Sequence, residues 1–361
     1  MKAAVLKAPK QLVVEDIPVF PLDSNLVLVK VEACGICGSD IRYFNGENPW
    51  ALHTLGEARP NPPNIVLGHE YCGTVVEVAD KSFENLLGKR VGVLAYRPCG
   101  RCYWCHTGRE NLCPNTTHIG HGAGWGERDY YPGGMAEYGI SWADLSYPIP
   151  DSISSEEAAL LDVVGVGVHA VNIGNIVPGE PIAILGCGPV GAAILQIAKA
   201  YGAGAIYVTD IYPFALNLAK DTGATLAINP QEHDEDIVKL IMSETNKQGC
   251  CTVFDTIGTV TSLEQGLKIT GKQGTLVELA VHDVSISLNI MALSSERSIK
   301  TSCNSRLQDY QTCINLLEAR RIIIQPWISH RFTLTDVPKA FKIMELKEQN
   351  NAFKIMILPN N

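Results

Sequence analysis

Four cysteines lie close together in the first third of the chain, within residues 99–113. Thiolates at this spacing can close around one tetrahedral Zn²⁺, because Zn–S bonds of about 2.3 Å draw four sulfurs toward one point. The alternative, a set of scattered buried cysteines or disulfides, rarely places four thiols so evenly. The sequence therefore predicts a structural zinc lobe whose ligands are Cys99, Cys102, Cys105 and Cys113.

A thiol and an imidazole from two separate segments form a second candidate metal site. Cys37 stands just before Ser39 and Asp40, and His69 stands just before Glu70. A catalytic zinc uses such ligands together with a further ligand and an open position for substrate or water. Spacing alone also allows a cysteine and a histidine of the core. Glu70 and Asp40 are candidates to orient the imidazole and to tune the charge on the metal.

A glycine turn, Gly-x-Gly-x-x-Gly, stands between a strand-like run and a helical pattern in the middle of the chain. Gly186 permits the tight turn, Gly188 lets the backbone approach a pyrophosphate, and Gly191 allows close packing of helix on strand. The next strand-like run ends in Asp210, where a carboxylate binds the adenosine ribose. The alternative is turn glycines and a solvated aspartate. The predicted cofactor-binding residues are Gly186, Gly188, Pro189, Val190, Gly191 and Asp210.

The charge of Asp210 also bears on which cofactor is used. A carboxylate repels a 2′-phosphate, and residues 211–215 contain no arginine or lysine that would hold one. The sequence therefore predicts NAD rather than NADP.

The elements that position these residues fall into two types. Residues 1 to about 150 carry short β-type runs, such as 26–31 and 73–78, which favour a β-rich lobe. From there to about 290, apolar strand-like runs alternate with helical patterns, which predicts βαβ units and a parallel sheet covered on both faces. A helical stretch at 307–320 and a strand-like run at 353–358 complete either lobe. The predicted fold class is α/β.

Length and charge narrow the function. A chain of 361 residues favours about two domains. The net charge of −9 argues against nucleic acid as a partner. No apolar run reaches the roughly 18 residues of a membrane helix, and the N-terminus lacks the apolar segment of a secretory signal. We therefore expect a cytoplasmic protein without a membrane partner, whose twelve cysteines are metal ligands and core residues.

In their order and spacing, these motifs resemble the zinc-dependent medium-chain dehydrogenases and reductases, which include alcohol, sorbitol and threonine dehydrogenases. The resemblance also covers residues 133–138 and 329–332, and so nearly the whole chain. It implies a GroES-like catalytic domain, residues 1–153 completed by 292–361, and a Rossmann NAD-binding domain, residues 154–291. It also implies substrate binding in the cleft between them and a homodimer or homotetramer.

The resemblance assigns roles to single residues. Cys37 and His69 become ligands of the catalytic zinc, and Glu70 becomes the adjacent carboxylate that can approach the metal. Asp162 stands where alcohol dehydrogenases have Cys and sorbitol-like members usually have Glu, so it becomes the third ligand; the alternative is a carboxylate at a helix start. Asp at this position also occurs in the formaldehyde dehydrogenase and dismutase branch. Ser39 becomes the first acceptor of the substrate proton.

The implied reaction is hydride transfer from a carbinol carbon to the nicotinamide, with zinc as the Lewis acid. Alcohol dehydrogenases continue the proton relay through a His where this chain has Arg42, which leaves water, a ribose hydroxyl or Glu70 as the next acceptor. Arg42 either touches substrate or is a solvated surface residue. Polar and aromatic residues in two long loops, 46–64 and 118–132, suit a hydroxyl-rich ligand; lids or oligomer contacts are the alternative.

The sequence thus predicts an enzyme with one catalytic zinc, one structural zinc and NAD, which oxidises a secondary alcohol: a polyol, a sugar or an amino alcohol. An alcohol or aldehyde dehydrogenase of the formaldehyde type is the alternative enzyme. A non-catalytic NAD-binding or zinc-binding protein is the alternative from another class.

Overall fold

The chain folds into two compact units. The structure, a computed structural model, describes residues 1–232, 237–280, 282 and 285–360. The first unit comprises Met1–Asp162, Arg306–Glu318 and Trp327–Asn361, and the second comprises Val163–Ser305 and Ala319–Pro326.

The first unit is rich in β-structure. Its largest sheet has the strand order β10-β6-β5-β3-β18-β17, and β9 also pairs with β3. The bounds of these strands are β3 Leu26–Gly35, β5 Glu70–Val78, β6 Arg90–Val93, β9 Tyr138–Trp142, β10 Ser146–Pro148, β17 Ile328–Thr333 and β18 Lys354–Leu358. Two smaller sheets contain β1 Lys2–Ala8, β2 Gln11–Asp16 and β4 Ile65–Val66, and β7 Tyr96–Arg97 with β8 Thr117–His118.

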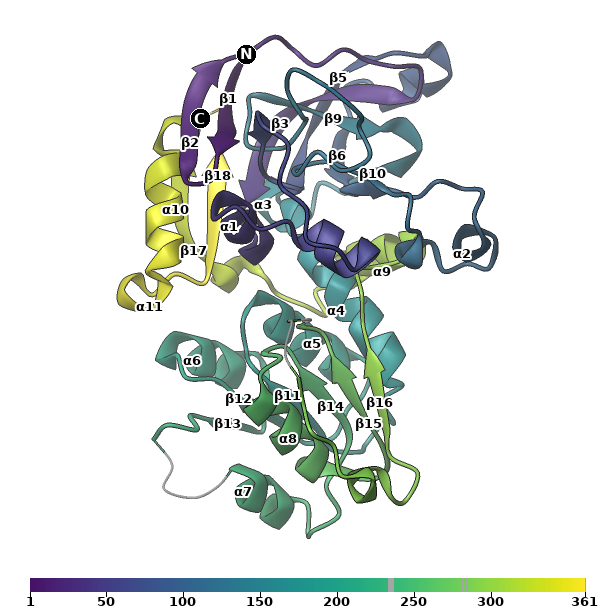
Figure 1. Cartoon of the computed structure of the whole chain (residues 1–361), viewed down its shortest axis with the longest axis vertical. Coiled ribbons are helices and arrows are strands. Elements are labelled where there is room, and N and C mark those ends of the chain that lie inside the picture. Colours follow the sequence, from purple (N-terminus) through teal and green to yellow (C-terminus); the bar gives the residue numbers. More distant parts are fainter. Residues whose placement is uncertain (233–236, 281, 283–284, 361) are drawn as a thin grey trace. The chain divides into compact units, whose positions relative to one another are not determined.

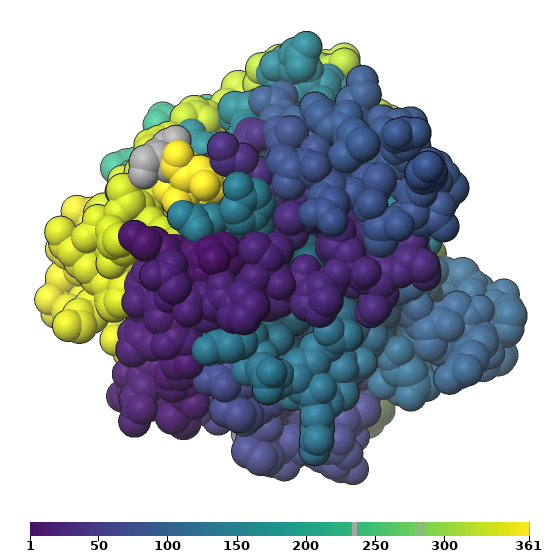
Figure 2. All heavy atoms as spheres, turned by 90° about the horizontal axis from the view of Figure 1, so that it is seen from above, coloured from purple at the N-terminus to yellow at the C-terminus, as the bar shows by residue number. Residues whose placement is uncertain are grey.

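The C-terminal segment completes this unit. Strand β18 pairs antiparallel with β3 through Met356 and Gly35, and parallel with β17. Helix α10 (Val337–Glu345) contacts both α1 (Gly38–Phe44) and β2. Purple N-terminal and yellow C-terminal atoms accordingly adjoin on the face shown in Figure 2. The other helices of this unit are α2 Tyr103–His106, α3 Ser155–Ala159, α9 Leu307–Glu318 and α11 Lys347–Asn350.

The second unit is built on a parallel sheet in the order β13-β12-β11-β14-β15-β16, seen in the lower part of Figure 1. Its strands are β11 Ile182–Leu185, β12 Ile206–Thr209, β13 Leu226–Ile228, β14 Cys250–Asp255, β15 Thr270–Glu278 and β16 Ser298–Thr301. Its helices are α4 Leu161–Gly174, α5 Pro189–Ala200, α6 Pro213–Thr222, α7 Ile237–Glu244 and α8 Val260–Ile269; α4 begins at the last two residues of the first unit. The predicted α/β class with a Rossmann-type sheet is confirmed.

Apolar side chains from both strands and helices form the core of this sheet. Leu185, Val253 and Leu276, from three neighbouring strands, pack with Ile241 and Leu267 from α7 and α8. Strand β11 is apolar throughout, as is expected where helices cover both faces of a parallel sheet. Strand order reverses between β11 and β14, and dinucleotides bind outside the carboxyl ends of the strands at such a point.

The limits of the compact units differ from the predicted domain limits of 153/154 and 291/292. Residues 155–159 form α3, which packs on β3, β5 and β6 and therefore lies in the first unit. Residues 298–301 form β16, which extends the parallel sheet of the second unit. Among the residues that the structure describes, no helix is long and apolar enough to cross a membrane.

Candidate active site and metal centres

The four cysteines of the predicted lobe converge. The Sγ atom of Cys102 lies 3.5 Å from that of Cys105 and 3.8 Å from that of Cys113, and the sulfurs of Cys99 and Cys105 are 4.0 Å apart. Sulfurs at the corners of a tetrahedron with Zn–S bonds of 2.3 Å are about 3.8 Å apart. The four thiols therefore fit one zinc ion. A backbone hydrogen bond from Arg101 lowers the pKa of Cys99 to about 6, which favours the thiolate that zinc binds.

A second group of metal-type ligand atoms comes from Cys37, His69 and Glu70, which lie within 4.8 Å of one another. Cys37 is the N-cap of α1, two residues beyond the end of β3. Strand β5 begins at Glu70, which pairs with Gly35 of β3. This register brings the thiol to the histidine and the carboxylate, although 31 residues separate Cys37 from the nearer of them.

Asp40 holds the two ligand segments together. Its buried carboxylate accepts hydrogen bonds from the backbone N–H of Cys37 at 2.8 Å and from that of Gly68 at 3.2 Å. One of its oxygens lies 3.6 Å from Nδ1 of His69. Burial lowers the pKa of His69, but the negative charges of Asp40 and Cys37 raise it by more, so that it stands well above its ordinary value. The site thus favours positive charge, as a zinc ion requires.

Glu70 has a second partner besides the metal-type group. Nζ of Lys354 donates to both carboxylate oxygens of Glu70, at 2.9 and 2.7 Å, and to the carbonyl oxygen of Ile36 at 3.1 Å. Both side chains are buried. A side chain on Gly35 would collide with the Glu70 carboxylate, so only glycine leaves room for it. Sequence reasoning missed Lys354, whose signal is a single charge within the apolar run 353–358.

Asp162 lies in the first turn of α4, outside the group formed by Cys37, His69 and Glu70. Its Oδ1 accepts a hydrogen bond from the hydroxyl of Tyr310 at 3.1 Å. Burial raises the pKa of Asp162, while the nearby charge of His69 lowers it and that of Glu70 raises it. The role of Asp162 as a zinc ligand therefore stays a prediction.

Ser39 and Arg42 both lie on α1. Ser39 is half-buried and lies two residues from Cys37. Nε of Arg42 donates to Glu47 at 2.7 Å, in an ion pair at the protein surface. The structure therefore gives Arg42 a partner other than substrate.

The glycine turn follows β11. Gly186 has φ of +86°, and a side chain there would collide with Thr256 and Ile257. Gly188 is the N-cap of α5, and a Cβ atom at this position would meet open space. Gly191 packs against the carbonyl of Gly186 too closely for any side chain. These are the conditions that a dinucleotide turn requires.

Two further features complete this turn. Pro189 and Val190 open the first turn of α5, whose N-terminus carries the partial positive charge that attracts phosphate. Asp210 accepts hydrogen bonds from the backbone N–H of Cys187 at 2.7 Å and of Tyr212 at 2.9 Å. The carboxylate thus adjoins the turn, where a ribose hydroxyl would reach it.

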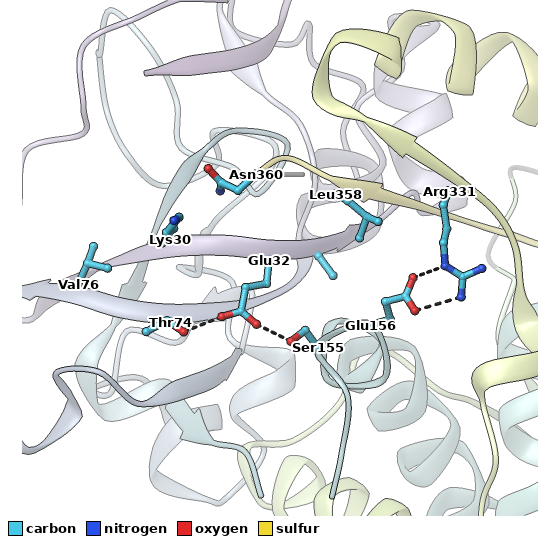
Figure 3. A pocket seen from close by; sticks show the side chains of 10 residues that line it. Lys30, Glu32, Thr74, Val76, Ser155, Glu156, Arg331, Leu358 and Asn360 are labelled. Atoms are coloured by element: carbon cyan, nitrogen blue, oxygen red, sulfur yellow. Dashed lines mark hydrogen bonds and ion pairs between the residues drawn. The ribbon is translucent and has the colours of Figure 1, made fainter. Parts of the chain in front are cut away.

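A pocket of about 730 Å³ also opens on the first unit, away from the predicted site residues, and Figure 3 shows its lining. Glu32 accepts hydrogen bonds from Thr74 at 2.6 Å and from Ser155. Arg331 donates to both oxygens of Glu156, at 2.6 and 3.0 Å. These groups satisfy one another, so the pocket points to no particular ligand.

Comparisons with known proteins agree with this geometry. Residues 23–151 match the family model of the alcohol dehydrogenase GroES-like domain, and residues 189–319 match that of the zinc-binding dehydrogenase. A sorbitol dehydrogenase of Bacillus subtilis is 32% identical over 100% of this chain and 98% of its own.

Solved structures show the same fold. L-idonate 5-dehydrogenase of Escherichia coli has a TM-score of 0.85 at 26% identity, over 99% of this chain and 97% of its own. 2R,3R-butanediol dehydrogenase of Bacillus subtilis has a TM-score of 0.86 at 26% identity, over 99% of both chains. The fold, the thiol-rich lobe, the glycine turn and the relatives over the whole length agree: the chain belongs to the zinc-dependent medium-chain dehydrogenase family.

Proposed function

We propose that this chain is a zinc- and NAD-dependent polyol dehydrogenase, which transfers hydride from a secondary hydroxyl carbon of a polyol or sugar to NAD⁺. The observation that carries the proposal is the convergence of Cys37, His69 and Glu70 in a chain that matches a sorbitol dehydrogenase along its whole length. A mixed set of thiolate, imidazole and carboxylate suits zinc.

Different residues of the first unit bind the zinc ion, orient its ligands and accept the substrate proton. A bound zinc ion supplies a Lewis acid that polarises a substrate oxygen. Cys37 and His69 hold it, with Glu70 or Asp162 as the carboxylate ligand. Asp40 orients the ligands through the backbone of both ligand segments. Ser39, two residues from Cys37, takes the substrate proton.

The residues of the second unit hold the cofactor. The backbone from Gly186 to Gly191 and the N-terminus of α5 receive the pyrophosphate. Asp210 binds the adenosine ribose, and its negative charge selects NAD over NADP. This charge discriminates because no arginine or lysine lies in 211–215 to hold a 2′-phosphate.

The test is the appearance of NADH by absorbance, with purified zinc-loaded protein, NAD⁺, and sorbitol, xylitol, 2,3-butanediol, 2-butanol, ethanol and formaldehyde as substrates. We expect the highest kcat/KM for a polyol. Turnover confined to ethanol or formaldehyde would favour the formaldehyde-type alternative. Cys37→Ala is expected to lose one zinc ion and all turnover. A protein that binds zinc and NADH but oxidises nothing would contradict the proposal.

The assembly and the location are proposed as well. Strand β16 is the edge of the parallel sheet, and Ile290 and Met291, which precede it in the sequence by eight and seven residues, are 73% and 69% exposed. A homodimer that pairs β16 with its copy would satisfy this edge and cover these side chains. All twelve cysteines are free, which agrees with a reducing, cytoplasmic location.

A further inference from the structure

Two histidines lie near the candidate metal centre without belonging to its ligand group. His118 ends β8, and His121 follows three residues later; both are at least nine-tenths buried. The centroids of their rings are 4.5 Å apart. Buried paired imidazoles outside a metal site call for another role.

The segment that carries both histidines packs directly on the metal-ligand segment. Gly120 lies between them, with φ of +91°. A Cβ atom at Gly120 would lie 2.9 Å from the carbonyl carbon of Gly68 and 3.0 Å from Cβ of His69. The backbone between His118 and His121 therefore touches the candidate zinc ligand His69.

Each ring is held by a specific neighbour. The ring of His121 stacks on that of Tyr43, with centroids 5.0 Å apart and 7° between the planes. Tyr43 follows Ser39 by four residues on α1, so both side chains share one side of that helix. Nε2 of His118 lies 3.0 Å from the hydroxyl oxygen of Thr116. His121 is thus tied to the helix that carries the proposed proton acceptor.

Nδ1 of His121 is buried and has no hydrogen-bond partner within the described part of the chain. A buried polar atom without a partner is unfavourable, so a ligand that supplies one is bound more tightly. Burial lowers the pKa of His118 to about 3 and that of His121 well below its ordinary value. A neutral imidazole has one donor and one acceptor nitrogen, which matches a hydroxyl group, itself both donor and acceptor.

We propose that His118 and His121 form a hydroxyl-binding subsite beside the metal centre, which recognises a second hydroxyl group of the substrate. This inference rests on the proposed function, because it names what selects a polyol over a simple alcohol at the same site. His121 provides the unpartnered nitrogen, and His118 fixes the position of the His121 ring. A carboxylate or phosphate is a poorer match, since it offers acceptors only.

The test compares 2,3-butanediol with 2-butanol, which share a carbon skeleton and differ by one hydroxyl group. His121→Phe keeps an aromatic ring on Tyr43 and removes both nitrogens. We expect kcat/KM for the diol to fall about tenfold or more, as for one lost hydrogen bond to a buried group, and that for 2-butanol to change less than twofold. Calorimetric titration of 2,3-butanediol into the complex with NADH is expected to show the same loss of affinity, with two zinc ions per chain retained.

A matched control is His330→Phe. His330 is a half-buried imidazole of the same unit, and its Nδ1 lies 2.9 Å from the Ser329 hydroxyl. The variant is expected to leave kcat/KM for both 2,3-butanediol and 2-butanol unchanged. If His121→Phe fails to fold by circular dichroism, His121→Gln replaces it, with a smaller loss for the diol because the amide still donates and accepts.

The outcomes separate the two proposals. An equal fall for diol and monohydric alcohol, or no fall for either, overturns the subsite while leaving the dehydrogenase intact. If wild-type protein oxidises no substrate of the panel, the proposed function fails, and calorimetry alone decides on the subsite. Equal affinity of the wild type and His121→Phe for the diol then overturns it.

Discussion

The contact between Lys354 and Glu70 sets the charge at the candidate metal centre. Glu70 is fully buried and lies within reach of both a metal ion and the Lys354 ammonium. Without a metal ion, Lys354 is the cation within hydrogen-bond distance of this carboxylate. If Glu70 is a zinc ligand, as proposed, zinc and Lys354 share this carboxylate. We therefore expect Lys354 to stabilise the metal-free protein and to compete with the metal for Glu70.

Replacing Lys354 with methionine tests this competition. Removing one partner of a buried ion pair costs about 3–5 kcal/mol, because the other charge stays buried without compensation. We expect Lys354→Met to lower the free energy of unfolding by this amount in chelator-treated protein, and by less in zinc-loaded protein, where the metal offsets Glu70. Urea unfolding of wild type and variant, with and without chelator, measures both differences.

The double variant Lys354→Met, Glu70→Gln is the control. It removes both charges, so most of the stability of the chelator-treated protein should return. Equal destabilisation of the single variant with and without zinc would show that Glu70 does not face the metal, and Asp162 would then be the better candidate for the carboxylate ligand.

We propose that Asp210 decides between the two nicotinamide cofactors. Its carboxylate is held beside the glycine turn by the N–H of Cys187. Removing a hydrogen bond to a charged group costs about 1.5–3 kcal/mol, or about 10- to 100-fold in Kd. We expect Asp210→Ala to weaken NADH binding by this factor and to lower the ratio of the Kd for NADPH to the Kd for NADH, as measured by fluorescence titration. Asp210→Asn should also lower this ratio, with a smaller loss of affinity for NADH. Unchanged affinities for both cofactors would refute the assignment.

Among the elements, the thiol-rich lobe depends most on its metal. Helix α2 has four residues, too few to be stable alone, and two of the sulfurs are at Cys102 and Cys105 within or next to it. We therefore expect zinc to organise the lobe. We expect Cys102→Ser to reduce zinc from two ions to one per chain and to speed amide hydrogen exchange in residues 99–113. Cys37→Ala should also lose one zinc while leaving exchange in the lobe unchanged; equal exchange in the two variants would contradict a separate structural site.

The carboxyl ends of β14 and β15 bring two acids together. Asp255 and Glu278 occupy paired positions on these strands, and both are buried. Burial, helped by the charge of Asp255, raises the pKa of Glu278 from its ordinary value of 4.5 to about 8. The folded state therefore holds a proton that the unfolded chain releases near pH 4.5. Its contribution to stability is complete below pH 4.5 and is lost as pH rises through 8.

Glu278→Gln removes this dependence, because an amide resembles the protonated acid and does not ionise. We expect the melting temperature of the variant relative to wild type to rise by about 5–10 °C between pH 5.5 and pH 8.5. Thermal unfolding followed by circular dichroism at both pH values measures it. Glu244→Gln, at an exposed position, serves as the control. The difference between its melting temperature and that of the wild type should be the same at both pH values. If the difference in melting temperature between Glu278→Gln and the wild type does not change with pH, Glu278 is charged in the folded protein.

Across the whole molecule, local pattern predicted the elements well. The helical stretch 307–320 begins with α9 and extends two residues past its end, and the strand-like run 353–358 differs from β18 by one residue. Both are short periodic segments whose neighbours in sequence determine them. The glycine turn could be predicted equally well, because each of its glycines is required by local sterics.

What local pattern could not predict depends on contacts between distant segments. Lys354 reaches Glu70 across 284 residues, and Tyr310 reaches Asp162 across 148. No periodicity or spacing encodes such pairs; the sheet register that joins β18 to β3 creates the first of them. His121 lies in the loop 118–132, which the sequence predicts to suit a hydroxyl-rich ligand, but its stacking on Tyr43 depends on how this loop packs against α1.

Strand β16 forms an edge of the parallel sheet and is a candidate surface for assembly. An unpaired strand presents free N–H and C=O groups, and large exposed apolar side chains such as Ile290 and Met291 favour contact with another chain. We expect the wild type to have at least twice the 39.2 kDa chain mass in light scattering after size-exclusion chromatography. Ile290→Asp with Met291→Asp buries two charges in such an interface and should halve the mass of a dimer. Val177→Asp, at a 49% exposed position of the same unit, should leave it unchanged. A monomeric wild type, or equal dissociation by the control, would remove β16 as the interface.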